Sequence, residues 1–516
     1  MDNNGVGSWL HRRRNKSGSQ TALIHGERKL SYLELANRTD RLANALRDRG
    51  VAKGDRVAYL GENHPSFVET FFACGLLGAI FVPLNTRLAA PELQFQLQDC
   101  GARVLVNAEA LDVVASASVA DTVVTHRLVV ASDDGPESGD ATLPSGVEQY
   151  GEVIEGADAA TLDEAVTLDD GAMILYTSGT TGKPKGALLT HGNITWNCIN
   201  TVVDMDLGRN DVALMISPLF HVASLDMGLL PMLLKGATVI LESKFDPARV
   251  LELVGRHKVT TLSGVPTTFQ MLCDHPEWPT ADLSSLDKLT CGGSAVPQRV
   301  LDAYEERGIG FTACYGMTET APGATMLPVS ASKEKAGSAG LAHFFTDVRI
   351  VDPFGGVVGA GQVGEIQISG PNVIKEYWNR PEATAESYAD SNWFRSGDMG
   401  SLDEQGFLFV SDRLKDMIIS GGENIYPAEV EAAIAELQAV GSVAVIGVSD
   451  EKWGEVPRAV VTLREGTSLT EEQLRSHLEG KLARYKIPKS VVFVEEMPRT
   501  ASGKIRKTDL RKQYAR

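Results

Sequence analysis

The sequence predicts an α/β protein of layered, mostly parallel sheets and helices, followed by a smaller α+β unit. Two observations lead to this fold class. Apolar strand-like runs at residues 56–60 and 79–84 alternate with helix-like stretches such as 67–77, and this alternation is typical of parallel sheets covered by helices. From Asp412 onward the pattern changes to a compact unit of about 100 residues, which is the size of a domain.

Within the C-terminal unit, residues 427–437 and 469–482 are expected to form helices. Residues 443–448 and 459–463 are expected to form strands, because they are short apolar runs between polar segments. The acidic, Gly- and Ser-rich segment 131–158 predicts an excursion on the surface.

Length and composition indicate an ordinary globular protein with more than one domain. The chain has 516 residues, of which 43% are hydrophobic and 22% charged, as is usual for globular proteins. The longest apolar stretch, residues 71–84, is broken by glycines and too short to cross a bilayer, so we expect no integral membrane segment. Residues 1–16 hold three arginines but no following apolar run, so no secretory signal is expected.

The six cysteines favour free thiols in a cytoplasmic protein. No two of them form a Cys-x-x-Cys pair, so neither a disulfide framework nor a zinc site is indicated. They are Cys74, Cys100, Cys198, Cys273, Cys291 and Cys314.

The charge distribution excludes some partners and favours others. A formal net charge of −18 argues against nucleic acid or an anionic membrane surface. Residues 484–516 nevertheless carry ten Lys and Arg against three Asp and Glu, a local net charge of +7. This basic segment either surrounds a phosphate site or is a solvated tail. The sequence leaves the oligomeric state open, with a homodimer as one alternative.

A short segment, residues 176–186, has the composition of a polyphosphate-binding loop, and we call it the phosphate loop. Glycines let backbone N–H groups turn toward an anion, hydroxyls add donors, and lysines add positive charge. Its spacing is not that of a Walker A motif, because Lys183 is followed by Pro184. The alternative is a surface turn. The residues expected to hold phosphate are Thr177, Ser178, Gly179, Thr180, Thr181, Gly182, Lys183 and Lys185.

Four further motifs accompany the phosphate loop, and together they resemble the adenylate-forming superfamily of acyl-CoA synthetases, adenylation domains and luciferases. The phosphate loop, with His191-Gly192-Asn193 after it, resembles the first signature motif of that superfamily. The other segments, in the family's order, are Tyr-Gly-Met-Thr-Glu at 315–319, Ser-Gly-Asp at 396–398, Asp-Arg-Leu-Lys-Asp at 412–416, and Pro-Arg-Thr-Ala-Ser-Gly-Lys at 498–504. The likeness runs from about Leu30 to the end of the chain, and five motifs in order are very specific.

The resemblance implies a domain organisation and an activity. Residues 1–411 would form an adenylation domain with the acyl pocket, and residues 412–516 a mobile lid with a hinge and a catalytic lysine. The activity would be that of an AMP-forming carboxylic acid–CoA ligase. ATP and an acid would give an acyl-adenylate and pyrophosphate, and CoA would then take the acyl group as a thioester. ATP, Mg²⁺ and CoA are the implied ligands.

Three residues are expected to carry the adenylation chemistry. Glu319 is the metal candidate, because a carboxylate beside phosphates suits a Mg²⁺ ligand; the alternative is a surface glutamate. In the family the threonine that matches Thr318 contacts the α-phosphate. Lys504 would bring its ammonium to the pentavalent phosphorus, and its alternative is one more lysine of a basic tail.

Other residues are expected to hold the nucleoside. Tyr315 would stack on adenine beside Gly316, although a lone tyrosine is more often a core residue. Asp398 and Arg413 offer an acceptor and a donor to ribose hydroxyls, or form a structural ion pair. The backbone segment that would approach adenine and the acyl group comprises Gly292, Gly293, Ser294 and Ala295.

The second half-reaction requires a hinge and a path for the thiol. Lys415 occupies the family's hinge position. Gly421, Gly422 and Glu423 match the loop that lines the pantetheine tunnel in CoA ligases. His221 resembles the gate between acyl pocket and tunnel, and its alternative is a satisfied core histidine.

Residues 189–193 followed by 195–197, together with residues 344–348, resemble bacterial feruloyl-CoA synthetases, with features of actinobacterial fatty-acyl-CoA ligases. Cys314 stands where relatives commonly have glycine, so it disfavours a bulky acid if it edges the acyl pocket. Ala223 and Met227 are expected to be apolar pocket walls. We therefore expect an uncharged small-molecule acid, either aromatic (hydroxycinnamate- or benzoate-like) or a medium- to long-chain fatty acid.

Two other functions remain open at this stage. An adenylating enzyme could pass its activated group to a carrier-protein thiol or a nitrogen nucleophile. A non-catalytic nucleotide-binding protein is the second alternative, and the joint presence of Lys504, Glu319 and the phosphate loop argues against it.

Overall fold

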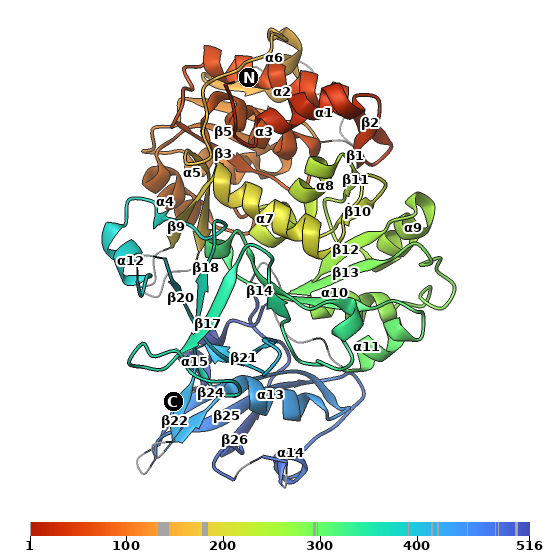
Figure 1. Cartoon of the computed structure of the whole chain (residues 1–516), viewed down its shortest axis with the longest axis vertical. Coiled ribbons are helices and arrows are strands. Elements are labelled where there is room, and N and C mark those ends of the chain that lie inside the picture. The colour runs from red at the N-terminus through yellow and green to blue at the C-terminus, as the bar shows by residue number, and fades with distance from the viewer. Residues whose placement is uncertain are drawn as a thin grey trace. The chain divides into compact units, whose positions relative to one another are not determined.

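The computed structural model describes residues 2–132, 144–177, 184–292, 296, 298–390, 392–413, 416–420, 423–450, 453–479, 481–482, 484–500 and 504–515. These form two compact units (Figure 1). The first comprises residues 1–334, 342–347 and 369–392, and the second comprises 335–341, 348–368 and 393–516. The second unit is larger than the expected lid because an additional antiparallel sheet groups with it. The expected boundary between residues 411 and 412 marks where the lid would begin to move as one body, and it stays a prediction.

The first large sheet of the first unit has nine strands and a parallel centre. The five pairings from β14 through β13, β12, β10 and β11 to β1 are parallel, and β2 and β15 join antiparallel. In spatial order the strands are β16 (Leu341–Ala342), β15 (Gly323–Met326), β14 (Phe311–Gly316), β13 (Lys288–Gly292), β12 (Thr261–Gly264), β10 (Val212–Met215), β11 (Thr238–Leu241), β1 (Thr21–His25) and β2 (Arg28–Ser31).

The second large sheet of the first unit has eight strands, and it carries the phosphate loop. The pairings from β8 to β7 are parallel, whereas β9 and β19 join antiparallel at one edge. Its order is β19 (Glu376–Tyr377), β9 (Lys185–Thr190), β8 (Gly171–Thr177), β4 (Ile80–Pro83), β3 (Arg56–Leu60), β5 (Ala102–Ala108), β6 (His126–Val130) and β7 (Val147–Gln149). The expected α/β class with mostly parallel sheets is confirmed.

Helices cover both sheets of the first unit (Figure 1). They are α1 (Ser8–Ser17), α2 (Tyr32–Asp48), α3 (Pro65–Leu77), α4 (Ala90–Cys100), α5 (Asp112–Ser118), α6 (Tyr150–Gly156), α7 (His191–Asp204), α8 (Leu230–Lys235), α9 (Pro247–His257), α10 (Pro266–Cys273), α11 (Gln298–Glu305) and α12 (Pro381–Glu386). The π-helix η2 (Ala223–Leu229) precedes α8.

Helix α3 shows why the longest apolar run of the sequence belongs to the core. Every residue of α3 is buried, and Phe67 and Phe71 meet Phe81 of β4 edge to face at 5.0 and 5.7 Å. Burial of each ring contributes on the order of 2–3 kcal/mol. The helix ends at Gly78, whose φ of 67° suits glycine. No helix in the described ranges is long and apolar enough to cross a membrane.

The second unit contains two sheets. The four-stranded antiparallel sheet runs β17 (Asp347–Val351), β18 (Gly364–Ser369), β20 (Phe394–Leu402) and β21 (Leu408–Arg413). The other sheet runs β23 (Glu423–Ile425), β22 (Ile418–Ser420), β25 (Gly454–Leu463) and β24 (Val440–Asp450), with β26 (Ser490–Phe493) parallel to β25. Its helices are α13 (Pro427–Ala435), α14 (Glu471–Leu478) and α15 (Lys507–Tyr514).

The expected elements of the C-terminal segment are all present, with shifted ends. The expected helices are α13 and α14, and the expected strands lie within β24 and β25. The expectation of a plain surface excursion at 131–158 was wrong for its described end, since residues 147–149 form β7 and 150–156 form α6. Tyr150 and Ile154 of α6 are buried, so two apolar anchors outweigh the polar composition.

His191, the first residue of α7, ties the N-terminal segment to the first unit. Its Nδ1 accepts a hydrogen bond from the Val6 N–H at 3.2 Å. The ring is buried, and its Nε2 has no hydrogen-bond partner in the described part of the chain. Burial lowers the pKa of His191 to about 4, from 6.5 for an exposed histidine. A proton on Nδ1 would also remove the acceptor that Val6 uses.

We predict that His191 makes the protein less stable in acid. Between pH 6.5 and 4 the unfolded chain binds a proton at His191 that the folded chain does not bind. The free energy of unfolding therefore decreases as the pH is lowered through this range, by about 3 kcal/mol for a pKa shift of this size. His191→Asn keeps an acceptor without the titration and should flatten this part of the profile. Urea unfolding at pH 7, 5.5 and 4 measures it, with His275→Asn at a half-buried site as control. Parallel profiles for wild type and His191→Asn would contradict the assignment.

Candidate active site

The phosphate loop joins two antiparallel neighbours at the edge of the eight-stranded sheet. Thr177 at the end of β8 pairs with Lys185 at the start of β9, so the chain turns back on itself between them. The apolar strand expected before the loop is β8. Ser178, Gly179, Thr180, Thr181, Gly182 and Lys183 lie outside the described residues. The loop leads into a strand rather than a helix, which agrees with the exclusion of a Walker A motif.

Glu319 lies beside the strand end that opens this loop. The turn η3 (Thr318–Thr320) carries it, and its Oε1 accepts hydrogen bonds from the Tyr377 hydroxyl at 2.8 Å and the Thr177 hydroxyl at 3.5 Å. Its Oε2 has no hydrogen-bond partner among the described residues. A carboxylate held by one oxygen and open at the other fits a Mg²⁺ ion that takes its remaining ligands from phosphates and water.

Tyr377 connects the phosphate loop to the Glu319 turn, and the sequence reasoning missed it. It lies on β19, the edge strand that pairs with β9, where Tyr377 faces Ala187. The Lys185 ammonium lies over its ring, 5.4 Å from the centroid. Burial and the neighbouring Glu319 raise the pKa of the Tyr377 hydroxyl, so the hydroxyl is a donor at neutral pH. A lone tyrosine after a polar segment gives no local signal for this role.

The backbone around Glu319 is closely packed. A Cβ on Gly316 would lie 1.7 Å from the Pro322 carbonyl oxygen, so only glycine fits where β14 ends. The Met317 N–H donates to the Pro322 carbonyl at 3.0 Å, and the Ile374 N–H donates to the Glu319 carbonyl at 2.9 Å. The turn that carries Thr318 and Glu319 is therefore fixed on both sides.

Buried asparagines of α7 hold the loops that surround this turn. Asn193, Asn197 and Asn200 follow one face of the helix at intervals of four and three residues, and all are buried. Asn197 Oδ1 accepts from the Gly323 N–H at 3.0 Å and its Nδ2 donates to the Asp226 carbonyl at 2.8 Å. Asn193 Nδ2 donates to the carbonyls of residues 371 and 373. The helical spacing of these polar residues was the signal that could have revealed them.

A fourth buried asparagine, Asn372, completes the arrangement from the opposite side. Its Nδ2 donates to the carbonyls of Thr320 and Gly323, both at 2.7 Å. Its Oδ1 accepts from the Thr346 hydroxyl at 2.8 Å. Every polar atom of the Asn372 side chain is thus used to hold backbone or a neighbour of the turn.

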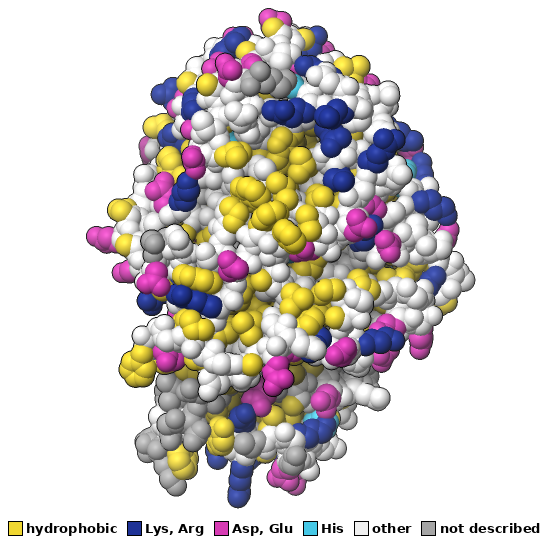
Figure 2. Space-filling view, in the orientation of Figure 1, with side chains coloured by type: hydrophobic (Ala, Val, Ile, Leu, Met, Phe, Trp, Pro, Cys, Tyr) yellow, Lys and Arg dark blue, Asp and Glu magenta, His cyan; other side chains and the backbone are white. Residues whose placement is uncertain are grey.

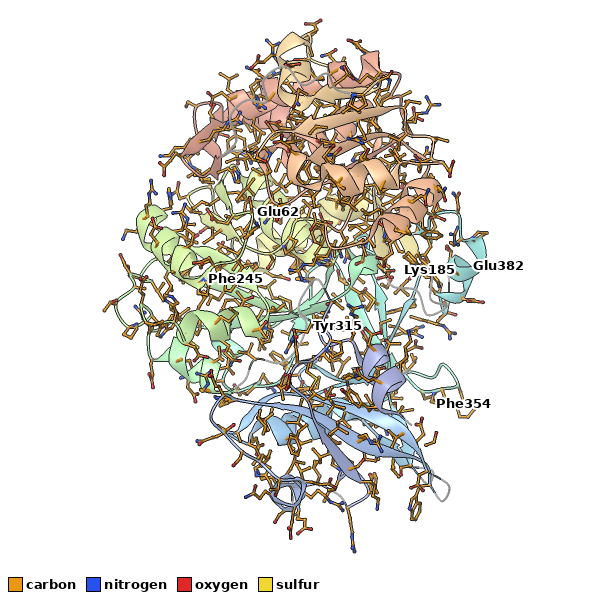
Figure 3. The ribbon with its side chains drawn as sticks, turned by 180° about the vertical axis from the view of Figure 1, so that it is seen from behind. Glu62, Lys185, Phe245, Tyr315, Phe354 and Glu382 are labelled. Carbon is orange, nitrogen blue, oxygen red and sulfur yellow. The ribbon has the colours of Figure 1, made fainter. Side chains whose placement is uncertain are left out.

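The residues expected around adenine and the acyl group lie on adjacent strands. Gly292 of β13 pairs with Cys314 of β14, and Tyr315 is the next residue. Tyr315 is half-buried, and Figure 3 labels it together with Lys185. Burial raises the pKa of the Cys314 thiol, so it behaves as an apolar side chain. Gly293, Ser294 and Ala295 lie outside the described residues.

The expected gate and pocket walls come from one short segment. His221 is half-buried with its ring 4.7 Å from that of Phe220. Ala223 is exposed and Met227 buried, and both lie on η2. Asp226 of the same π-helix is fully buried, and neither of its carboxyl oxygens has a hydrogen-bond partner in the described ranges. Desolvation raises the pKa of Asp226 well above its usual value, which favours the neutral acid.

The remaining predicted residues belong to the second unit. Asp398 of β20 is buried and pairs in register with Arg413 of β21 across the antiparallel pair; their expected role at the ribose stays a prediction. Lys504 is exposed in a loop closed by a bridge between Arg499 and Ile505, so it is not part of a core. Glu423 opens β23, whereas Lys415, Gly421 and Gly422 lie outside the described residues.

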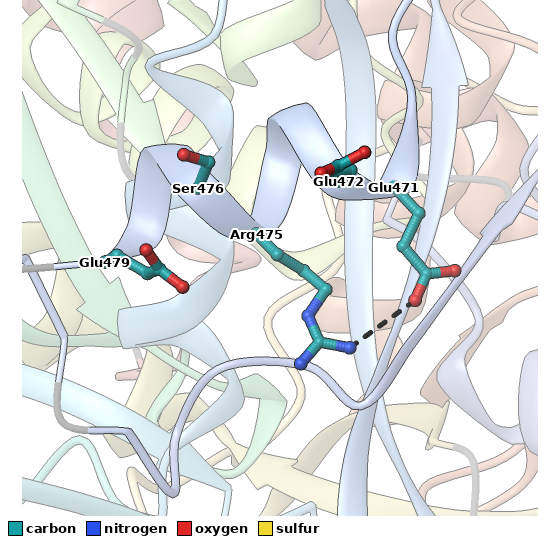
Figure 4. A pocket seen from close by; sticks show the side chains of 5 residues that line it. All are labelled: Glu471, Glu472, Arg475, Ser476 and Glu479. Carbon is teal, nitrogen blue, oxygen red and sulfur yellow. Dashed lines mark ion pairs between the residues drawn. The ribbon is translucent and has the colours of Figure 1, made fainter.

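Two surface features hold none of the predicted site residues. A hollow beside α14 is lined by Glu471, Glu472, Arg475, Ser476 and Glu479. Arg475 pairs with Glu471 across one helical turn, at 3.6 Å (Figure 4). Hydrophobic side chains also gather on the face that carries α7 (Figure 2). Trp196 of α7 packs edge-on against Phe345, with ring centroids 5.0 Å apart.

Two family models match the chain. The AMP-binding enzyme model matches residues 10–378, and the model for the C-terminal domain of AMP-binding enzymes matches residues 429–504. The first contains the phosphate loop, the Glu319 turn and Tyr377. The second contains Lys504.

Full-length relatives agree with these matches. The chain is 50% identical over 515 residues to a feruloyl-CoA synthase of Amycolatopsis, with 100% of both chains covered. It is 43% identical to an indoleacetate–CoA ligase of Aromatoleum aromaticum, covering 99% of this chain and 98% of the relative. The crystal structure of ATP-bound MatB from Rhodopseudomonas palustris superposes with a TM-score of 0.91 at 31% identity, covering 99% of each chain. The chain belongs to the AMP-binding enzyme family and is an AMP-forming acyl-CoA synthetase of the adenylate-forming superfamily.

Proposed function

We propose that this enzyme activates an uncharged aromatic carboxylic acid in the cytoplasm and transfers it to CoA. The first reaction joins a carboxylate oxygen of the acid to the α-phosphorus of ATP, and pyrophosphate leaves as the bond to the bridging oxygen breaks. The CoA thiolate then attacks the acyl carbonyl, and AMP leaves. The observation that carries the proposal is that Thr177 donates a hydrogen bond to Glu319 and pairs with Lys185, so that all three residues lie at one end of the eight-stranded sheet.

The geometry at this sheet edge suits the polyphosphate of ATP. Thr177 and Lys185 flank the loop that would hold the β- and γ-phosphates, and both side chains are half-buried. Glu319 would bind Mg²⁺ through its open oxygen, and the ion would offset phosphate charge there. Thr318, at the start of the same turn, would contact the α-phosphate. Because the turn is fixed by buried hydrogen bonds, these groups are oriented before ATP arrives.

The residues of the second unit would complete the reaction. Asp398 and Arg413 would hold the ribose. Lys504, which is exposed on its loop, would stabilise the charge that develops at the α-phosphorus. Lys415 would serve as the hinge. Residues 412–516 would move as the lid, so that Gly421, Gly422 and Glu423 line the thiol path after adenylation.

The acyl pocket is expected beside η2 and β14. Ala223, Met227 and the protonated Cys314 carry no charge. A second carboxylate or an amine on the acid would therefore find no ionic partner among them. The feruloyl-CoA and indoleacetate relatives are named for acids with an aromatic ring, which supports the same class. His221 would separate this pocket from the thiol path.

We predict that aryl acids give the highest turnover. Hydroxycinnamates and arylacetates should release pyrophosphate and form thioesters only with CoA present, with kcat/KM at least tenfold above that of dicarboxylic or amino-substituted acids, because these bury an unpaired charge. Coupled pyrophosphate release and chromatography of thioesters measure this. Best turnover with long-chain fatty acids would contradict the aromatic class. Acid-dependent pyrophosphate without thioester would instead indicate transfer to a carrier protein or a nitrogen nucleophile.

We predict that Lys504→Ala separates the two half-reactions. Adenylation should fall by about 10²–10³, the usual cost of losing a charge-stabilising group at a reacting centre, whereas thioester formation from preformed acyl-adenylate should stay within threefold of wild type. Lys512→Ala removes one exposed charge from the same basic segment and serves as the matched control. Equal losses in both half-reactions would show that Lys504 has another role.

We predict that Cys314→Gly broadens the acyl pocket. Removal of the side chain should raise kcat/KM for ring-extended acids about tenfold relative to the unsubstituted acid, because the space gained matches one or two methylene groups. Cys291→Ala, on the neighbouring strand, is the control for loss of a buried thiol. Unchanged ratios across the acid panel would place Cys314 outside the pocket.

A further inference from the structure

Tyr377 occupies an unusual position between two opposite charges. Its hydroxyl donates to Glu319 Oε1 at 2.8 Å, while the Lys185 ammonium lies against its ring. Lys185 and Glu319, both within the described ranges, form no ion pair with each other. The aromatic ring attracts a cation through its face, so one side chain satisfies the lysine and the glutamate at the same time.

The backbone of Tyr377 is fixed independently of these contacts. Its strand pairs with β9, the Tyr377 N–H donates to the Thr384 hydroxyl at 3.0 Å, and the Trp378 N–H donates to the Gly186 carbonyl at 2.7 Å. These backbone contacts use neither the Lys185 ammonium nor the Glu319 carboxylate, so they do not depend on what those two groups bind. A ring held in this way can act as a spacer, that is, it can keep the side chains on its two sides from contacting each other.

We propose that Tyr377 is a positioning residue that keeps Lys185 and Glu319 apart and available to ATP and its metal. The inference rests on the proposed roles of these two residues. In a half-buried site a lysine and a glutamate attract strongly. If they paired directly, the lysine would be withdrawn from phosphate and the glutamate from Mg²⁺. The hydroxyl of Tyr377 also fixes which carboxylate oxygen remains open for the metal.

Two substitutions separate the hydroxyl from the ring. Tyr377→Phe keeps the spacer and the cation–π contact but loses the hydrogen bond to Glu319. It should weaken metal binding about tenfold, as for other residues that orient a metal ligand, with less than threefold change in the KM for ATP. Tyr377→Leu removes both contacts and should raise the KM for ATP about tenfold as well. The KM for the acid should stay within twofold in both variants.

The measurements use the full-length protein and include a readout other than turnover. Binding of Mn²⁺ to the enzyme with saturating ATP and no acid is measured by electron paramagnetic resonance, and Mg²⁺ dependence by pyrophosphate release. Tyr388→Phe is the matched control, because the Tyr388 hydroxyl in the same segment donates to a backbone carbonyl, that of Ile374. It should bind Mn²⁺ as wild type does.

A double-mutant cycle tests the spacer role directly. If Lys185 captures Glu319 when the ring is absent, removal of the lysine should release the carboxylate. Tyr377→Leu should then weaken Mn²⁺ binding about tenfold in the wild-type background but less than threefold in the Lys185→Ala background. Equal effects in both backgrounds would overturn the spacer role.

The reference variant Glu319→Gln distinguishes this inference from the proposed function. If Glu319→Gln weakens Mn²⁺ binding and Tyr377→Phe does not, the role of Tyr377 is wrong while the metal role of Glu319 stands. If Glu319→Gln leaves Mn²⁺ binding unchanged, the metal role fails and the inference falls with it.

Discussion

The architecture of the site depends on buried asparagine side chains that hold backbone in place of regular secondary structure. The segment from Thr318 to Pro322 connects β14 to β15, so its N–H and C=O groups, and those of Gly323 at the start of β15, need partners outside the strand ladder. Asn197 and Asn372 supply them to Gly323 and Thr320. Each buried backbone group without a partner would cost about 1–3 kcal/mol. An asparagine side chain carries both donors and an acceptor, and so can serve two chain segments at once.

This arrangement joins parts of the first unit that are distant in sequence. Asn197 contacts both the Glu319 turn and η2, the element expected to line the acyl pocket. Asn193 holds the segment that leads into β19 and Tyr377. A single helix, α7, therefore holds the segment that follows the Glu319 turn, the segment that leads into β19, and the π-helix η2. The first residue of α7, His191, also holds the N-terminal segment in place, because its Nδ1 accepts a hydrogen bond from the Val6 N–H.

Local sequence patterns predicted the elements but not the contacts between them. Strands β3 and β4, helix α3 and the strand before the phosphate loop follow from apolar periodicity, and Thr318 and Glu319 follow from a contiguous motif. Tyr377 was missed because its role requires β19 to pair with β9 and to face a turn 58 residues earlier in the chain. The helix α6 was missed because its two buried residues lie in a segment of polar composition. The burial of Asp226 could not be predicted either, because a single acidic residue in an apolar run is equally compatible with an exposed position.

The charged residues with proposed roles differ in their burial. Glu319 and Lys185 lie half-buried beside a fixed turn, and in the proposed arrangement Tyr377 would keep them from neutralising each other before ATP binds. Lys504 is exposed on a loop whose ends are joined by hydrogen bonds between Thr500 and Lys504. In the proposed role, its charge would be buried only as negative charge develops at the α-phosphorus, when a counter-charge is present. A lysine presented in this way can bind the reacting state more tightly than the ground state, which is the condition for accelerating the chemical step.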